Sequence, residues 1–286
     1  MGAYNFSPLR YPGGKNKLAK YVANLIEYND LTNGIYIEPY AGGAAVALNL
    51  LINGKVNNII INDYDRSIYA FWYSVLNNTD KLCDLIENTP INLDVWNYFK
   101  NLQKDKNNIP LLELGFATFF LNRTNRSGII KAGVIGGKNQ NGNYKMDCRF
   151  PKNTLIEKIR LISQYKENIQ LYNLDTIDLI DTVINEIQEN TFAFFDPPYY
   201  KKGSTLYVNY YNHHDHEKLR DRIGNIHQNH KWIVTYDNVS EISDLYSNYR
   251  NVNYSLTYTA EKKYSGSEIM IYSDNMNLND NLIDVK

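Results

Sequence analysis

The stretch Thr191–Tyr200, TFAFFDPPYY, is an apolar run that stops at two consecutive prolines. The run Phe192–Phe195 is too short for a helix, and the prolines prevent its continuation, so it predicts a short buried strand. Because residues before a proline favour extended geometry, Asp196 and Pro197 leave this strand in one fixed direction. In an open α/β sheet, ligands bind just outside such carboxyl ends of strands.

The groups at this strand end suit the recognition of an amino group on an aromatic ring. The Asp196 carboxylate and the Pro197 carbonyl only accept hydrogen bonds, which matches the two donor hydrogens of an exocyclic amine. Tyr199 offers a flat face for stacking a base. The alternative is a proline-rich structural turn in which Asp196 caps a helix, and this short motif alone leaves both interpretations open.

A second strand-end site is predicted near the N-terminus. A strand at Ile35–Ile37, the turn EPYAGG at Glu38–Gly43 and a helix from Ala44 form a unit typical of dinucleotide-binding folds. The next strand, Asn58–Asn62, ends at Asp63, where such folds bind ribose hydroxyls. The alternative is that Asp63 caps the helix expected over Arg66–Leu76.

The rest of the chain alternates helices and strands, as an α/β fold requires. Periodicity predicts strands at Ile169–Tyr172 and Lys231–Tyr236, a helix over Leu179–Ile187, and a hairpin within Ser255–Ser273 that turns at Ser265–Gly266. Further helices are expected between Tyr69 and Pro110, over Leu112–Leu121 and over Leu155–Tyr165.

Composition describes a globular protein of 286 residues, with 43% hydrophobic and 21% charged residues. Two cysteines, Cys83 and Cys148, are too few for a disulfide framework. No apolar run reaches the length of about 18 residues that a membrane span needs, and the N-terminus lacks a signal pattern, so a cytoplasmic protein is expected.

Three histidines, His213, His214 and His216, cluster at the start of a helix that Asp215 is expected to cap and that extends to Ile226. They have no acidic or cysteine partner at metal-ligand spacing. This pattern favours surface histidines over a metal site, and no metal is expected.

The net charge of −1 conceals a strongly basic segment between Leu121 and Lys166, with ten basic and two acidic residues and a net charge of +8. The segment is rich in Gly and Asn and has little apolar content between Asn122 and Asn143. It predicts a loop or ribbon that lies on nucleic acid, whereas the alternative is a solvated face. The basic residues chosen as DNA contacts are Arg123, Arg126, Lys138, Lys145 and Arg149.

Several separated motifs together resemble the Dam-like (D12, alpha) class of DNA adenine-N6 methyltransferases. They are RYPGGK at Arg10–Lys15, EPYAGG at Glu38–Gly43, the acidic Asp63, FLNRTNRSG at Phe120–Gly128, RF at Arg149–Phe150 and DPPY at Asp196–Tyr199. Their order along the chain is that of the family, and the match covers most of the chain. The resemblance implies S-adenosylmethionine as methyl donor and a flipped adenine in double-stranded DNA as acceptor.

The resemblance also implies an architecture and a set of site residues. The fold would be α/β, a Rossmann-like methyltransferase domain from residues 1–76 and 167–286, with a mostly helical plus hairpin target-recognition domain inserted at 77–166. Catalysis would fall to Asp196, Pro197, Pro198 and Tyr199. The cofactor would be bound by Tyr11, Gly13, Gly14, Lys15, Glu38, Pro39, Tyr40, Ala41, Gly42, Gly43, Asp63, Asp175 and Asp196. The enzyme would belong either to a restriction-modification system, with a restriction endonuclease acting on the same site as its partner, or to the phage and orphan methylases that have no such partner.

Two other functions fit parts of the pattern. A methyltransferase acting on cytosine N4 or on a glutamine side chain would present a similar amine, but such enzymes more often carry Ser or Asn in place of Asp196. A catalytically silent DNA-binding protein that senses the cofactor would not need an intact Asp196, Tyr199 and glycine turn.

Overall fold

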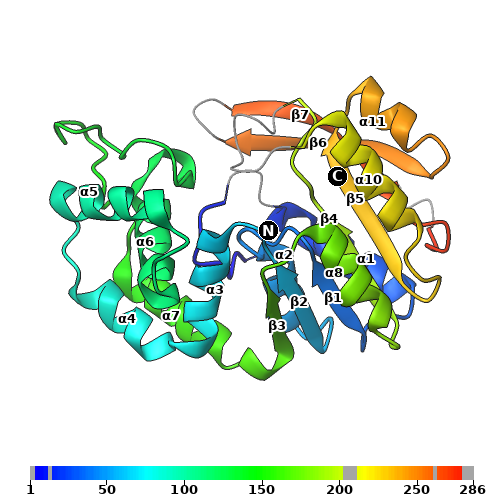
Figure 1. Ribbon diagram of the computed structural model, residues 1–286, viewed down its shortest axis with the longest axis horizontal. Helices are drawn as coiled ribbons and strands as arrows, with labels where there is room; N and C mark the ends of the chain where they lie inside the picture. Colours follow the sequence, from blue (N-terminus) through cyan, green and yellow to red (C-terminus); the bar gives the residue numbers. More distant parts are fainter. Residues whose placement is uncertain (1–3, 12–14, 202–210, 260–262, 279–286) are drawn as a thin grey trace.

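One seven-stranded sheet, in the order β3-β2-β1-β4-β5-β7-β6, forms the centre of the protein (Figure 1). The structure, a computed structural model, describes residues 4–11, 15–201, 211–259 and 263–278, with the backbone alone for 256–259 and 263–265. The strands are β1 (Ile35–Glu38), β2 (Asn58–Asn62), β3 (Ile169–Tyr172), β4 (Thr191–Phe195), β5 (Lys231–Asp237), β6 (Asn251–Thr259) and β7 (Lys263–Tyr272).

The first five strands are parallel, and β7 is antiparallel to both β5 and β6. The strand order reverses between β1 and β4, whose register pairs Ile35 with Thr191. Because ligands of open α/β sheets bind at such a switch point, this topology predicts a site beyond the carboxyl ends of β1 and β4.

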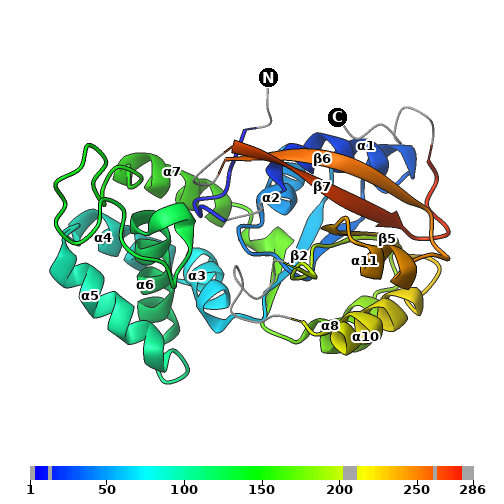
Figure 2. The same cartoon turned by 90° about the horizontal axis from the view of Figure 1, so that it is seen from above.

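Alternating residues of the strands belong to two hydrophobic cores, one on each face of the sheet. Tyr36, Phe194 and Ile233 pack on the face covered by α1 (Ala19–Tyr28) and α2 (Ala45–Ile52). The intervening residues of the same strands pack on the opposite face, which is covered by α8 (Thr176–Thr182), α10 (His213–Gly224) and α11 (Ser240–Leu245). Figure 2 shows the sheet between these two layers.

A group of helices lies to one side of the sheet (Figures 1 and 2). It comprises α3 (Arg66–Asn77), α4 (Thr79–Asn88), α5 (Leu93–Leu102), α6 (Leu111–Thr124) and α7 (Lys152–Ser163). Helix α6 is buried on almost every side. A Cβ on its Gly115 would lie 2.4 Å from the Ala70 carbonyl oxygen, so this glycine permits the close packing of α6 on α3.

Residues 129–151 of the basic segment, which precede α7, form turns rather than a regular ribbon. The segment's one isolated bridge within the described residues pairs Asn125 with Val134. Gln140, with φ of 50°, holds the loop together: its side-chain amide donates to the Ile135 carbonyl at 2.7 Å and accepts from the Met146 N–H at 2.9 Å. Buried Val134 and Met146 anchor the loop to the helices.

Short 3-10 turns complete the described elements: η1 (Asn16–Leu18), η2 (Gln103–Asp105), η3 (Arg126–Gly128), η4 (Lys166–Asn168) and η5 (Ile184–Glu186). The helix expected over Leu179–Ile187 is therefore wrong in its bounds, because α8 ends at Thr182 and η5 follows. Across the described parts of the chain, no helix combines the length and apolar character that crossing a membrane requires.

The hairpin within Ser255–Ser273 is confirmed, but its turn is not at Ser265–Gly266. Gly266 pairs with Leu256 inside the ladder, and the last pair before the turn is Thr259 with Lys263. Residues 260–262, between the members of this last pair, lie outside the described chain. The turn was predicted at Gly266 because glycine is common in turns, but glycine also occurs within strands.

The start of α10 differs from the prediction in two respects. Asn212, not Asp215, is the N-cap; the two side chains form a reciprocal capping box, with Asp215 at the third position of the helix. His216 is fully buried and bonds through Nδ1 to the Tyr236 hydroxyl at 2.9 Å, so it is not a surface histidine. His216 lies three and seven positions before Leu219 and Ile223, so it shares with them the face of α10 that packs on the core.

Candidate active site

A cavity of about 410 Å³ opens at the predicted switch point. It receives side chains or backbone from the loops after β1, β2, β3 and β4. Among the residues expected at the site, it is lined by Tyr11, Lys15, Glu38, Tyr40, Ala41, Gly43, Asp63, Asp175, Asp196 and Pro198. The cavity therefore joins the glycine turn to the Asp-Pro-Pro-Tyr motif, although 158 sequence positions separate Glu38 from Asp196.

The remaining expected residues lie behind this lining or outside the described chain. Pro39, Gly42, Pro197 and Tyr199 support the cavity without lining it. Gly13 and Gly14 fall outside the described residues. Asp175 lines the cavity and also caps α8, accepting a hydrogen bond from the Ile177 N–H at 2.9 Å.

The glycine turn after β1 is held in a left-handed conformation. Gly42 has φ of +46°, and a Cβ there would lie 2.6 Å from the ring of Tyr11. Both facts require glycine, because another residue would be strained and would displace the tyrosine. The Gly42 N–H donates to the Asp63 carboxylate at 2.9 Å, and the Trp72 indole donates to the Gly42 carbonyl at 2.9 Å.

Asp63 is half-buried at the end of β2 and lines the cavity. Its pKa is raised to about 7, chiefly by burial and also by the nearby Asp65 carboxylate, while hydrogen bonds from the Asp65 and Gly42 N–H groups oppose the shift. The helix-cap alternative for Asp63 is wrong. Asp65 is the N-cap of α3, and its side chain accepts from the Ser67 N–H at 3.0 Å.

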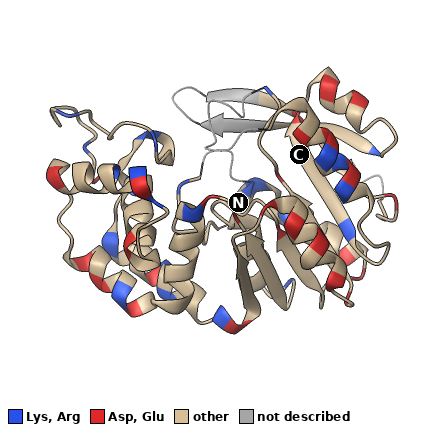
Figure 3. Ribbon diagram, in the orientation of Figure 1, with Lys and Arg blue, Asp and Glu red and all other residues tan. Residues whose placement is uncertain are grey.

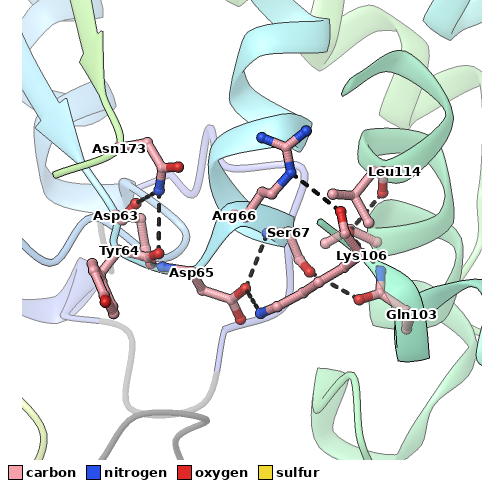
Figure 4. Close-up of polar contacts among 10 residues, drawn as sticks. Asp63, Tyr64, Asp65, Arg66, Ser67, Gln103, Lys106, Leu114 and Asn173 are labelled. Atoms are coloured by element: carbon pink, nitrogen blue, oxygen red, sulfur yellow. Dashed lines mark hydrogen bonds and ion pairs between the residues drawn. The ribbon is translucent and has the colours of Figure 1, made fainter. Parts of the chain in front are cut away.

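Figure 4 shows how this acidic turn joins the helical group beside the sheet. Asp65 forms an ion pair with Lys106 at 2.6 Å, and the Ser67 hydroxyl donates to Gln103 at 2.8 Å. Arg66 donates to the Lys106 carbonyl at 3.2 Å. The loop between α5 and α6 therefore positions the turn that carries Asp63.

Glu38 performs a capping function that its position in β1 does not suggest. Its Oε1 accepts from the Ala47 N–H at 2.9 Å and from the Tyr36 hydroxyl at 3.0 Å. Helix α2 begins after Ala44, a residue in left-handed conformation that makes no side-chain cap. Glu38 thus satisfies an amide at the helix N-terminus. Burial raises its pKa to about 8.

Asp196 is placed at the inner end of the cavity with 22% of its side chain exposed. Its Oδ1 accepts from the Thr235 hydroxyl at 2.8 Å and lies 3.3 Å from the Lys15 ammonium. Burial raises its pKa, the Lys15 ammonium opposes the rise and the Glu268 carboxylate adds to it. Asp196 therefore lies between charges of opposite sign.

Beside Asp196, a buried polar network surrounds Glu268. The Glu268 carboxylate accepts from the Tyr199 hydroxyl at 2.6 Å and from the Tyr254 hydroxyl at 2.6 Å. The Lys15 ammonium lies 3.0 Å from Glu268, hydrogen-bonds the Tyr199 hydroxyl, and lies 4.8 Å from the centre of the Tyr199 ring. The aromatic ring of the motif is thus fixed by a residue of β7.

The sequence analysis did not identify Thr235, Asp237 or Glu268 as site residues. Asp237 accepts from the backbone N–H groups of Tyr200 and Lys201, and so holds the chain after the motif. The two-residue alternation of side chains along a strand could have identified Thr235 and Asp237 as site residues. Thr235 and Asp237 follow Ile233 at intervals of two, so they continue the face that carries Phe194 and Asp196.

The basic residues predicted to contact DNA differ in their environments. Arg126, Lys138, Lys145 and Arg149 are exposed. Arg123 instead donates to the carbonyls of Arg149 at 2.6 Å and Pro8 at 3.4 Å. Its pKa is lowered to about 10, chiefly by burial and also by the neighbouring Arg10 and Arg149. Arg123 therefore makes structural contacts, while Figure 3 shows other basic positions on the loops beside α5 and α6.

The motif NRTNRSG, at Asn122–Gly128, connects the helical group to the N-terminal segment through contacts with Arg10. The Asn122 side chain accepts from the Arg10 N–H and donates to the Arg10 carbonyl, each at 2.8 Å. A Cβ on Gly128 would lie 2.0 Å from the Arg10 carbonyl oxygen, so only glycine fits there. This contact places Tyr11 and Lys15 at the cavity.

No metal site is formed in the part of the chain that the structure describes: no three His, Cys, Asp or Glu side chains converge. The cavity lining instead suits a nucleoside with a charged chain. Asp63 and Asp175 supply acceptors, Gly43 lets the backbone approach a ligand closely, and Val46 and Ile68 supply apolar surface. The residues present therefore fit S-adenosylmethionine.

The sheet order, the glycine turn after β1 and the acidic residue after β2 define a Rossmann-like, S-adenosylmethionine-dependent methyltransferase. Residues 11–262 match the D12 class N6 adenine-specific DNA methyltransferases, and the chain belongs to this family. It is an enzyme that transfers a methyl group from S-adenosylmethionine to the N6 amino group of adenine in DNA. The alternative acceptors, cytosine N4 and a glutamine side chain, are therefore wrong.

Curated relatives include two Type II methyltransferases. M.MjaIII of Methanocaldococcus jannaschii is 24% identical over 72% of this chain and 73% of its own. M1.LlaDCHI of Lactococcus lactis subsp. cremoris is 25% identical over 74% of each chain. Among solved structures, the rRNA methyltransferase aviRa from Streptomyces viridochromogenes is similar at 11% identity, with a TM-score of 0.38 over 92% of this chain and 86% of its own.

Proposed function

We propose that the enzyme methylates a flipped adenine within a specific site of double-stranded DNA, with Asp196 and the Pro197 carbonyl accepting the two N6 hydrogens. The observation that carries this proposal is the single cavity lined by both Asp196 and Asp63. Adenine N6 lies inside the base stack, so it reaches a strand-end pocket only after flipping, which costs a few kcal/mol. Stacking on Tyr199 offsets part of this cost.

The donor end of the cavity is assigned to the turn after β1 and the acidic residues after β2 and β3. Asp63 accepts from the ribose hydroxyls, and Asp175 lies near the cofactor adenine. Gly43 and Glu38 flank the methionine part, with Tyr11 and Lys15 between the two ends. These assignments are supported by the shared lining of these residues. Bound S-adenosylmethionine supplies an electrophilic methyl group on a sulfonium.

Asp196 then orients the acceptor rather than removing a proton before transfer. Two acceptors hold the amine in place and direct the nitrogen lone pair at the methyl group. As the bond forms, positive charge develops on nitrogen, and the Asp196 carboxylate stabilises it. The Lys15 ammonium favours the ionised carboxylate, which only accepts hydrogen bonds.

DNA contact and site choice are assigned to residues 77–166 as an inserted target-recognition domain. The exposed side chains of Arg126, Lys138, Lys145 and Arg149 support this assignment, because their charges have no carboxylate partner within 4.0 Å in the described chain. Arg123 acts by holding the loop, not by reading bases. The boundaries 1–76 and 167–286 for the catalytic domain belong to the same proposal.

The biological setting is proposed from the two Type II relatives: a cytoplasmic modification enzyme with a restriction endonuclease acting on the same site as partner. The test is sequencing of host DNA for N6-methyladenine with and without the gene, followed by transfer of tritiated methyl groups to that site by purified protein. Methylation of a single sequence context is expected. Equal methylation of unrelated sequence contexts, or no methyl transfer by the purified protein, would contradict the proposal.

A further inference from the structure

The geometry points to Glu268 as the positioning residue of the target-base pocket: its carboxylate holds Tyr199 and Lys15 in place for the adenine that Asp196 binds. This inference deepens the proposed function and rests on the roles proposed for Asp196 and Tyr199. Glu268 belongs to β7, outside every motif that carries the family resemblance.

A buried carboxylate requires a strong local reason. Glu268 exposes 1% of its surface and directly precedes the buried run Ile269–Tyr272 of β7, where an unpaired charge would cost several kcal/mol. Among the described residues, three donors contact its two oxygens: the Tyr199 hydroxyl on Oε1 and the Tyr254 hydroxyl and Lys15 ammonium on Oε2. Two of these three donors belong to the expected site.

The strand register directs Glu268 to this place. Glu268 pairs with Asp237 of β5 and with Tyr254 of β6, so it lies on the same face of the sheet as both. Met270, two positions along, packs on the face that carries Phe194. The same alternation that directs Asp196 toward the cavity therefore also directs Glu268.

Two contacts of Glu268, with Tyr199 and with Lys15, each fix one feature of the proposed base pocket. The hydrogen bond to the Tyr199 hydroxyl restricts rotation of the ring on which the base is proposed to stack. The ion pair with Lys15 fixes the ammonium that also reaches Asp196 at 3.3 Å. Since displacement by 1 Å can lower a rate about 100-fold, such restraint affects turnover more than folding.

The test compares Glu268→Gln with Tyr272→Phe in the full-length enzyme. Glutamine keeps the shape of the side chain but removes its charge. Tyr272 is a matched control: it is a fully buried residue of the same strand and face, and its hydroxyl bonds to the Tyr21 hydroxyl at 2.7 Å, away from the site. Each variant alters polar contacts at one buried side chain only.

For Glu268→Gln, we expect the single-turnover methylation rate on the host-determined DNA site to fall at least about tenfold, with S-adenosylmethionine affinity within about twofold of wild type. A duplex with 2-aminopurine at the target adenine should show a changed fluorescence of the flipped base. Tyr272→Phe should match wild type in all three measurements. A rate for Glu268→Gln within about threefold of wild type would overturn the inference.

The pH profile supplies a readout that a purely structural role would not move. Within the described residues, the charged and titratable side chains that face Asp196 or its neighbours Lys15 and Glu268 include Glu38, Tyr36, Tyr199 and Tyr254. Removing the Glu268 charge should shift the acid limb of the rate to lower pH, because one negative neighbour of Asp196 is lost. An unmoved limb would also overturn the inference. Wild-type inactivity on every adenine site would instead contradict the proposed function itself.

Discussion

The backbone N–H of Gly42 donates to the Asp63 carboxylate at 2.9 Å, which joins the turn after β1 to the end of β2. The bond satisfies an amide in a left-handed turn and orients one oxygen of the carboxylate. Two residues 21 positions apart thus connect the glycine turn to the cavity that Asp63 lines. Variants of Asp63 therefore affect both the turn and the ligand.

Asp63→Ala should weaken S-adenosylmethionine binding by about 1–3 kcal/mol, the range for a lost hydrogen bond to a charged group. Asp65→Ala is the matched comparison: it should lower the free energy of unfolding by about 0.5–2 kcal/mol through loss of the α3 cap, with a smaller effect on the donor. Calorimetric titration and urea unfolding measure the two effects. Unchanged donor affinity in Asp63→Ala would leave the carboxylate with a structural role only.

Asp196→Ala should abolish methyl transfer and leave donor affinity nearly intact. Asp196 is proposed to accept from the target amine, whereas the donor contacts are assigned to Gly43 and Asp63. A turnover assay with calorimetry tests this, and Asp84→Ala, at an exposed position of α4, is the control. Retention of more than about a tenth of wild-type turnover, a barrier change of only about 1.4 kcal/mol, would be incompatible with the assigned role.

Stability of the ligand-free enzyme should fall with rising pH because of Glu38. Its pKa is raised to about 8 in the folded state, so the folded protein binds a proton that the unfolded chain releases near pH 4.5. This contribution is complete below the unfolded value and is lost as pH rises through about 8, with a slope of at most about 1.4 kcal/mol per pH unit. Glu38→Gln keeps an acceptor for the Ala47 N–H and removes the titration.

Urea unfolding between pH 5 and pH 8 measures this effect. The difference in unfolding free energy between wild type and Glu38→Gln should change in favour of the variant as the pH rises. Parallel curves for the two proteins would show that Glu38 does not carry a raised pKa.

Replacing Lys138 and Lys145 together by glutamine should weaken binding to cognate and scrambled DNA alike. Each phosphate contact contributes a salt slope of about −0.9, so the slope should lose roughly one to two in magnitude. The control is Lys152→Gln. Lys152 donates to the carbonyls of Glu87 and Thr89, so its loss should affect stability rather than the slope. An unaltered slope in the double variant would place the DNA surface elsewhere.

The sequence determined the local elements of the site. Prolines after Phe195 end β4 and set the direction of Asp196, and glycines at 42 and 43 permit the turn after β1. Both follow from backbone geometry, which depends on residues close in the chain. The alternation of strands and helices could be predicted for the same reason, because hydrophobic period is also read from neighbouring residues.

Only the tertiary structure decided what surrounds those elements. Glu268 reaches Tyr199 through the register of an antiparallel strand whose hairpin turn was misplaced by the glycine signal. Likewise, Arg123 was chosen as a DNA contact from its charge, yet it bonds to two backbone carbonyls. Charge is a property of a single residue, and hydrophobic period is a property of a short stretch, so both can be read from the sequence. Burial and hydrogen-bond partners depend on segments that are distant in the chain and that only packing brings together.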